Sequence, residues 1–112
     1  MKDYIGVDIK KDSDGILQDV HWSAGLIGYF PTYSFGNLYA AQFYATLLKK
    51  VPKTPKLISK GNFKPVLEWL RENIHMHGKK YTAGRLVQKV TGEPLNAVYF
   101  QKYLEHKYRH NN

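Results

Sequence analysis

The sequence contains no cysteine among its 112 residues. This absence excludes a disulfide scaffold, a thiolate metal site and a cysteine nucleophile, and it is compatible with a protein of the cytoplasm. The sequence also lacks any run of about 18 apolar residues, the length that a helix needs to span a bilayer. The first residues mix charged and apolar side chains and do not form the continuous apolar stretch of a signal peptide. We therefore expect a cytoplasmic protein without a membrane-spanning helix.

Acidic residues are scarce in the second part of the chain. Residues 1–48 carry three Lys and five Asp, a net charge of −2, whereas residues 49–112 carry fourteen Lys and Arg against four Glu, a net charge of +10. Such asymmetry can indicate a surface that binds an acidic partner or a nucleic acid, and it can equally be one face of a larger protein whose acidic remainder is missing. No nucleic-acid-binding motif accompanies the charge, so a nucleic acid is the less favoured partner. A non-catalytic binding module that uses its basic half for an acidic partner or nucleic acid is the alternative to an enzyme.

Alternation of apolar and polar residues with a period of two, the pattern of a strand, is not sustained anywhere in the sequence. Capping residues and apolar stripes predict five helices instead. They are expected at residues 15–25, 34–51, 62–77, 82–91 and from 96 onward. The prolines of segment 51–55 predict an irregular connector. We therefore expect an all-α fold that forms a single helical domain over residues 1–112.

The helix expected at residues 34–51 has hardly any polar face. Its apolar residues are Phe35, Leu38, Tyr39, Ala40, Ala41, Phe43, Tyr44, Ala45, Leu47 and Leu48. A helix that is apolar on all sides is normally buried on most of them. Because the other predicted helices can cover only part of this surface, we expect either self-association or a missing N-terminal portion that covers the rest.

The most informative stretch is an eight-residue signature at residues 15–22, which has the form G-x-x-Q-D-x-H-W. It continues through residues 23–33 and 36–42, and two further stretches at 69–75 and 91–95 belong to the same pattern. Together these stretches resemble the C-terminal region of the thermostable carboxypeptidases, the carboxypeptidase Taq type of zinc metallocarboxypeptidase. The resemblance covers nearly the whole chain.

That resemblance implies the helical C-terminal segment of a larger, mainly helical metallopeptidase fold, which corresponds to the domain expected at residues 1–112. Enzymes of this family release C-terminal amino acids from peptides with a metal-activated water. They bind zinc through H-E-x-x-H on one helix and a Glu on a later helix, because two His one turn apart can face one ion. None of the five His in this sequence is followed by Glu. We therefore expect a C-terminal fragment or truncated homologue that binds no zinc itself and is inactive alone.

The resemblance also implies roles for five residues that form one wall of the active site. His21 and Tyr29 would stabilise the oxyanion of the tetrahedral intermediate, and Tyr33 would bind the terminal carboxylate of the peptide. Gln18 and Asp19 would orient His21. The division of roles between Tyr29 and Tyr33 stays open. By residue type alone, the histidine and tyrosines would be packing residues and Asp19 a helix cap or surface carboxylate.

Overall fold

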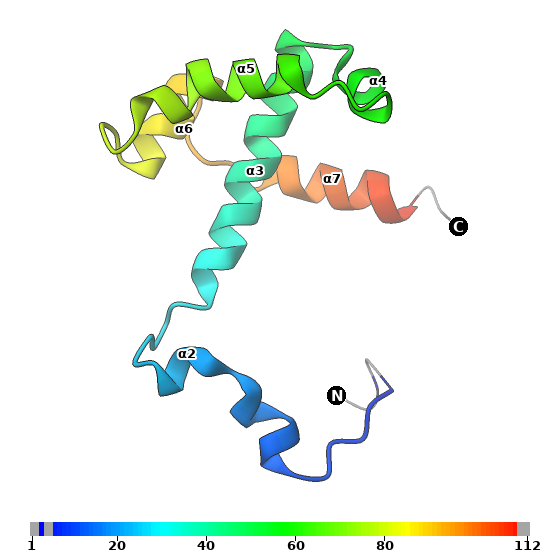
Figure 1. Ribbon diagram of the computed structural model, residues 1–112, viewed down its shortest axis with the longest axis vertical. Coiled ribbons are helices and arrows are strands. Elements are labelled where there is room, and N and C mark those ends of the chain that lie inside the picture. The colour runs from blue at the N-terminus through cyan, green and yellow to red at the C-terminus, as the bar shows by residue number, and fades with distance from the viewer. Residues whose placement is uncertain (1–2, 4–5, 110–112) are drawn as a thin grey trace. The chain divides into compact units, whose positions relative to one another are not determined.

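The computed structural model describes residue 3 and residues 6–109 of the chain (Figure 1). All secondary-structure elements assigned within these residues are helical, which confirms the predicted all-α fold. None of the helices in this described part is both long enough and apolar enough to cross a membrane. The chain divides into two compact units, Met1–Tyr33 and Ser34–Asn112.

Residues 6–30 of the first unit contain three short helical elements. They are the 3-10 turns η1 (Asp12–Asp14) and η2 (Ile16–Gln18) and the helix α2 (Val20–Ser23). The single helix predicted at residues 15–25 is therefore broken. The break lies at Asp19, which has extended backbone and whose side chain caps α2 by accepting the His21 N–H. After α2, Gly25 and Gly28 adopt φ angles of +75° and +78°, which side-chain-bearing residues rarely adopt, and turn the chain toward α3.

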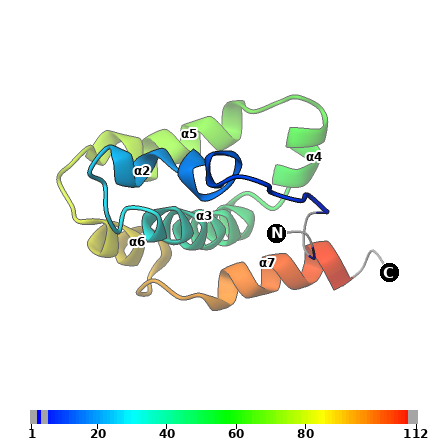
Figure 2. The same ribbon diagram turned by 90° about the horizontal axis from the view of Figure 1, so that it is seen from below.

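The second unit is built around α3 (Pro31–Lys50), whose first residues belong to the first unit. The elements that follow are α4 (Thr54–Ser59), α5 (Lys64–Asn73), η3 (His75–His77), α6 (Ala83–Thr91) and α7 (Val98–Arg109). Helices α5 and α7 pass on opposite sides of α3 (Figure 2). On the α5 side, Phe43 and Leu47 of α3 line one hollow together with Trp69, and on the α7 side, Ala41 lines another with Phe100.

The boundaries predicted for the helix at residues 82–91 are correct. Thr82 caps α6 through its side chain, and Gly92 ends it with a φ of +87°, both as predicted. In contrast, the helix predicted at residues 62–77 is divided into α5 and η3, and α5 begins after Phe63 and not after the expected cap Asn62.

Boundaries near prolines are also wrong. Helix α3 begins at Pro31 instead of Ser34, and Pro55 lies in the first turn of α4, within the predicted irregular connector. Proline is compatible with the first turn of a helix because its missing N–H has no partner there.

Helix α3 is less buried than its composition predicts. Its buried residues are Gln42, Thr46 and Leu47, two of which are polar. Phe35 and Tyr44, in contrast, are 54% and 40% exposed. A large part of the apolar surface of α3 is therefore in contact with solvent in the chain by itself.

Gln42 has no exposed surface and connects α3 to the segment between α6 and α7. Its Nε2 donates to Thr91 Oγ1 at 3.0 Å and to the Pro94 carbonyl at 3.0 Å, and its Oε1 accepts the Asn96 N–H at 2.8 Å. These bonds join residues that lie about fifty positions apart in the sequence. A polar residue on an otherwise apolar helix thus fixes the path of segment 91–96.

Replacing Gln42 by Ala is expected to lower the free energy of unfolding by about 3 kcal/mol, because buried donors and acceptors of segment 91–96 lose their partner. Gln101→Ala, at an exposed position of α7, is the matched control, and its expected change lies within about 0.5 kcal/mol. Denaturant unfolding of the two variants measures the difference. A loss below about 1 kcal/mol for Gln42→Ala would mean that its hydrogen bonds contribute little net stability.

Candidate functional site

His21 lies at the centre of a cluster of side chains in the first unit. Its Nδ1 is 2.7 Å from Asp19 Oδ1, and the same oxygen accepts the His21 backbone N–H at 2.8 Å. Its Nε2 is 3.1 Å from the Tyr33 hydroxyl oxygen. Both ring nitrogens of His21 therefore have a hydrogen-bond partner.

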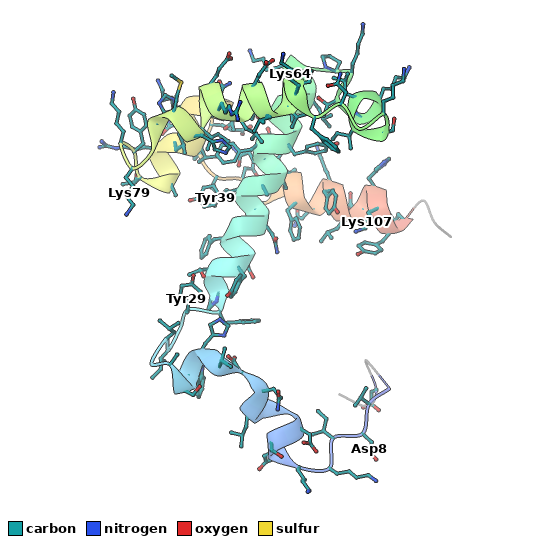
Figure 3. The ribbon with its side chains drawn as sticks, viewed as in Figure 1. Asp8, Tyr29, Tyr39, Lys64, Lys79 and Lys107 are labelled. Carbon is teal, nitrogen blue, oxygen red and sulfur yellow. The ribbon has the colours of Figure 1, made fainter. Side chains whose placement is uncertain are left out.

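Tyr29 contributes its ring to the same cluster. The rings of Tyr29 and His21 are stacked, with centroids 5.6 Å apart and planes inclined by 23°. The Tyr33 ring meets both of them edge-on, with centroids 5.7 Å away in each case. Tyr29 is labelled in Figure 3, where it lies just ahead of the first turn of α3. The turn through Gly25 and Gly28 thus returns the chain so that both tyrosines contact His21.

Asp19 is charged at neutral pH. The His21 backbone N–H that it accepts, and next the hydrogen bond with the His21 ring, lower the pKa of the Asp19 carboxyl below its usual value. Both bonds favour the ionised carboxylate. The side chains of Asp19 and His21 are 44% and 22% exposed, so the pair is open to solvent.

The structure brings together four of the five residues that were predicted to form the site. Gln18 is the exception, because its Nε2 donates to the Ser13 carbonyl at 2.5 Å, across the turn that precedes α2. Its observed contact therefore shapes the backbone ahead of Asp19 and is not a contact with the His21 ring.

An apolar hollow of about 670 Å³ lies beside the cluster, within the first unit. Its lining residues are Leu17, Asp19, Trp22, Ser23, Gly28, Phe30 and Pro31. Trp22 is 71% exposed and had no role in the predicted site, although it is the last residue of the signature. The position of Trp22 within the signature is the feature of the sequence that could have predicted its place at this surface.

The described residues do not fit a metal site. No group of three or more His, Cys, Asp or Glu side chains in residues 3 and 6–109 is placed to bind an ion. The cluster itself offers one carboxylate and one imidazole, whose ring nitrogens are both engaged. What the cluster can provide is hydrogen-bond donors, a ring that can carry positive charge, and one fixed negative charge on Asp19.

Comparison with known proteins connects this chain to one family. The chain is 43% identical over 107 residues to carboxypeptidase 1 of Bacillus subtilis and 46% identical over 107 residues to thermostable carboxypeptidase 1 of Thermus thermophilus. In both cases the match covers 96% of this chain and 21% of the relative, so the chain spans about a fifth of the length of these relatives.

Solved structures give the same result. Metallocarboxypeptidase 1 of Trypanosoma cruzi superposes with a TM-score of 0.84 at 39% identity, covering 97% of this chain and 23% of that protein. The M32 carboxypeptidase of Deinococcus radiodurans superposes with a TM-score of 0.83 at 40% identity, covering 96% of this chain and 22% of that protein. The sequence pattern described as carboxypeptidase Taq (M32) metallopeptidase matches residues 1–108. The chain therefore belongs to the carboxypeptidase Taq (M32) family of metallopeptidases.

Proposed function

We propose that this chain supplies the oxyanion-stabilising and substrate-binding wall of a cytoplasmic metallocarboxypeptidase that releases C-terminal amino acids from peptides. The observation that carries the proposal is the convergence of Asp19, His21, Tyr29 and Tyr33 in one hydrogen-bonded and stacked cluster. Family membership supports the proposal, because hydrolysis of a peptide bond would use each group of the cluster.

Hydrolysis of a peptide bond places negative charge on the carbonyl oxygen when water attacks the carbon. Donors that already point to that position lower the barrier, because they need no reorganisation as the charge forms. In the proposed arrangement the Tyr29 hydroxyl donates to this oxygen, and the stacked His21 ring adds positive charge beside it. Tyr33 donates to the terminal carboxylate of the peptide, which selects the last peptide bond.

Asp19 and Gln18 support this wall from behind. Asp19 holds the His21 ring through Nδ1 and fixes the start of α2 with the same oxygen. Gln18 acts one step further away, because its bond to the Ser13 carbonyl fixes the turn that carries Asp19. Loss of either is expected to disturb the position of His21 without removing a group that touches the peptide.

The metal of the proposed reaction is zinc, as the resemblance to the thermostable carboxypeptidases implies. The described residues include no suitable group of ligands, so we place the zinc and the water that it activates outside them. In the relatives, the metal ligands would lie in the part that this chain does not match, since the matched segment makes up only 21% of their length.

The isolated chain is therefore expected to release no C-terminal amino acid from an N-blocked dipeptide, with or without added zinc. Quantification of the free amino acid measures this, with a full-length relative as positive control. Release by the isolated chain that a chelator abolishes and zinc restores would contradict the proposal, because it would require a metal site that the described residues do not contain.

A further inference from the structure

We propose that Asp19, His21 and Tyr33 form a hydrogen-bonded chain in which proton uptake by His21 turns the Tyr33 hydroxyl proton outward to bind a carboxylate. The geometry that carries this inference is the engagement of both ring nitrogens, Nδ1 by Asp19 at 2.7 Å and Nε2 by Tyr33 at 3.1 Å. The inference rests on the proposed function in one respect, since it identifies the carboxylate as the C-terminus of a peptide.

The position of the first proton follows from Asp19. An ionised carboxylate only accepts hydrogen bonds, so the nitrogen that faces Asp19 Oδ1, Nδ1 of His21, carries a proton. In the neutral ring Nε2 then has a lone pair and accepts the O–H of Tyr33. In this state the phenolic proton of Tyr33 points to His21, and Tyr33 has no proton to donate to an anion.

A second proton on His21 reverses the last hydrogen bond. With Nε2 protonated, the imidazolium donates to the Tyr33 oxygen, and the phenolic proton is released to point away from the ring. The proton comes from solvent, which reaches the 22% exposed His21 side chain and the 54% exposed Tyr33. No other bond is formed or broken. Binding of an anion at Tyr33 and protonation of His21 therefore favour each other, as linkage requires.

Tyr29 and Tyr33 have different positions in this scheme. The charged and titratable groups that the structure places against His21 are Asp19, Tyr29 and Tyr33, all within the first unit. Tyr29 contacts the face of the ring and restricts its rotation. Tyr33 contacts the ring nitrogen and responds to its charge. Asp19 and His21 are positioning residues for the Tyr33 hydroxyl.

Nitrogen-15 NMR of the His21 ring in this chain tests the hydrogen bonds without any activity. When the His21 ring is neutral, we expect the proton on Nδ1 and an unprotonated Nε2. Tyr33→Phe should shift the Nε2 resonance and keep the proton on Nδ1, and Asp19→Asn should allow the proton to move to Nε2. Tyr29→Phe, which removes a hydroxyl but keeps the stacked ring, is the matched control and should leave Nε2 unshifted. A proton on Nε2 of the neutral ring in the unsubstituted chain, or an Nε2 resonance that ignores Tyr33→Phe, would overturn the proposal.

Kinetics of a full-length relative with the same residues at the matching positions tests the outward proton. Tyr33→Phe should raise KM for a peptide with a free carboxylate about tenfold, with kcat within a factor of about three. Asp19→Asn should not raise KM, because a proton on Nε2 of the neutral ring also turns the Tyr33 hydroxyl proton outward. The double variant should have the same KM as Tyr33→Phe alone, because the His21 proton acts on KM only through the Tyr33 hydroxyl. KM should also rise with pH in the parent enzyme, as His21 loses its second proton, and lose that dependence in Tyr33→Phe.

A KM of the double variant about tenfold above that of Tyr33→Phe, or a pH dependence of KM that survives Tyr33→Phe, would refute the proposed chain. These outcomes are distinct from failure of the proposed function. If the Tyr29→Phe variant of the same relative keeps its kcat, the proposed oxyanion role of Tyr29 fails. The position of the proton on Nδ1 and the KM of the double variant would still test the hydrogen-bonded chain of Asp19, His21 and Tyr33.

Discussion

Replacing Tyr29 by Phe at the matching position of a full-length relative is expected to lower kcat about 100-fold or more, with little change in KM. The reason is that a donor to the oxyanion acts on charge that exists mainly in the transition state. Substrate binding does not use that charge, so the loss appears in kcat. Steady-state kinetics on a peptide substrate separates the two parameters. His21→Ala should have a similar effect, but Tyr29→Phe is the cleaner change because it keeps the ring that stacks on His21.

A purely structural role for Tyr29 predicts a different pattern. In that case kcat per folded molecule would be nearly intact, and the substitution would act on stability. In the isolated chain, Tyr29 is 45% exposed, and loss of its hydroxyl should cost less than about 1.5 kcal/mol, the scale of one net hydrogen bond. Thermal unfolding of the same variant measures this. If kcat stays within a factor of about three, Tyr29 is structural and its proposed role fails.

The isolated chain is expected to self-associate. Large apolar side chains of the first unit are exposed to an unusual degree. Their exposed fractions are 70% for Leu17, 71% for Trp22, 79% for Ile27 and 66% for Phe30. Scattered exposed apolar residues are normal on a protein surface, but large contiguous apolar patches usually mark contacts with other polypeptide. Because three of these four residues line one hollow, the surface is contiguous there.

Light scattering at a concentration of ~0.1 mM should give a mass at least twice that of the 13.0 kDa chain. Leu17→Lys should shift the distribution toward the monomer, since a charge on the apolar surface opposes its burial. Met76→Lys, at a position that is 72% exposed in the second unit, is the matched control and should leave the mass unchanged. A monodisperse monomer for the unsubstituted chain, with no binding of an apolar dye, would show that the surface is stable in water.

Local capping signals correctly predicted α6 and the start of α7, but not the starts of α3 and α5. Thr82 and Gly92 bound α6, and Asn96 Oδ1 accepts the Val98 N–H at the start of α7, as expected. Proline was a further source of error, because Pro31 and Pro55 were expected in irregular segments and both lie in the first turn of a helix. The prediction of a single domain over the whole chain stays a prediction.

The site could be predicted only through its signature. Composition and spacing alone predict that His21 and the tyrosines are packing residues. Only the resemblance to the carboxypeptidase family indicated that they belong to an active site. The pairing of Tyr33, and not Tyr29, with Nε2 of His21 depends on the backbone turn at Gly25 and Gly28, whose φ values no local pattern specifies. The bond from Gln18 to Ser13 was missed for the same reason, since it depends on the break in the predicted helix. Hydrogen bonds across turns can be identified only from the three-dimensional structure.

Transplanting residues 1–108 of this chain into a full-length relative, in place of the segment that they match, tests the central claim most directly. The quantity to measure is kcat for release of the C-terminal amino acid, with and without His21→Ala and Tyr29→Phe in the transplanted segment. We expect an active chimera whose kcat falls about 100-fold with either substitution. An active chimera whose kcat changes by less than a factor of about three with both substitutions would contradict the claim, because these side chains would then not act on the transition state.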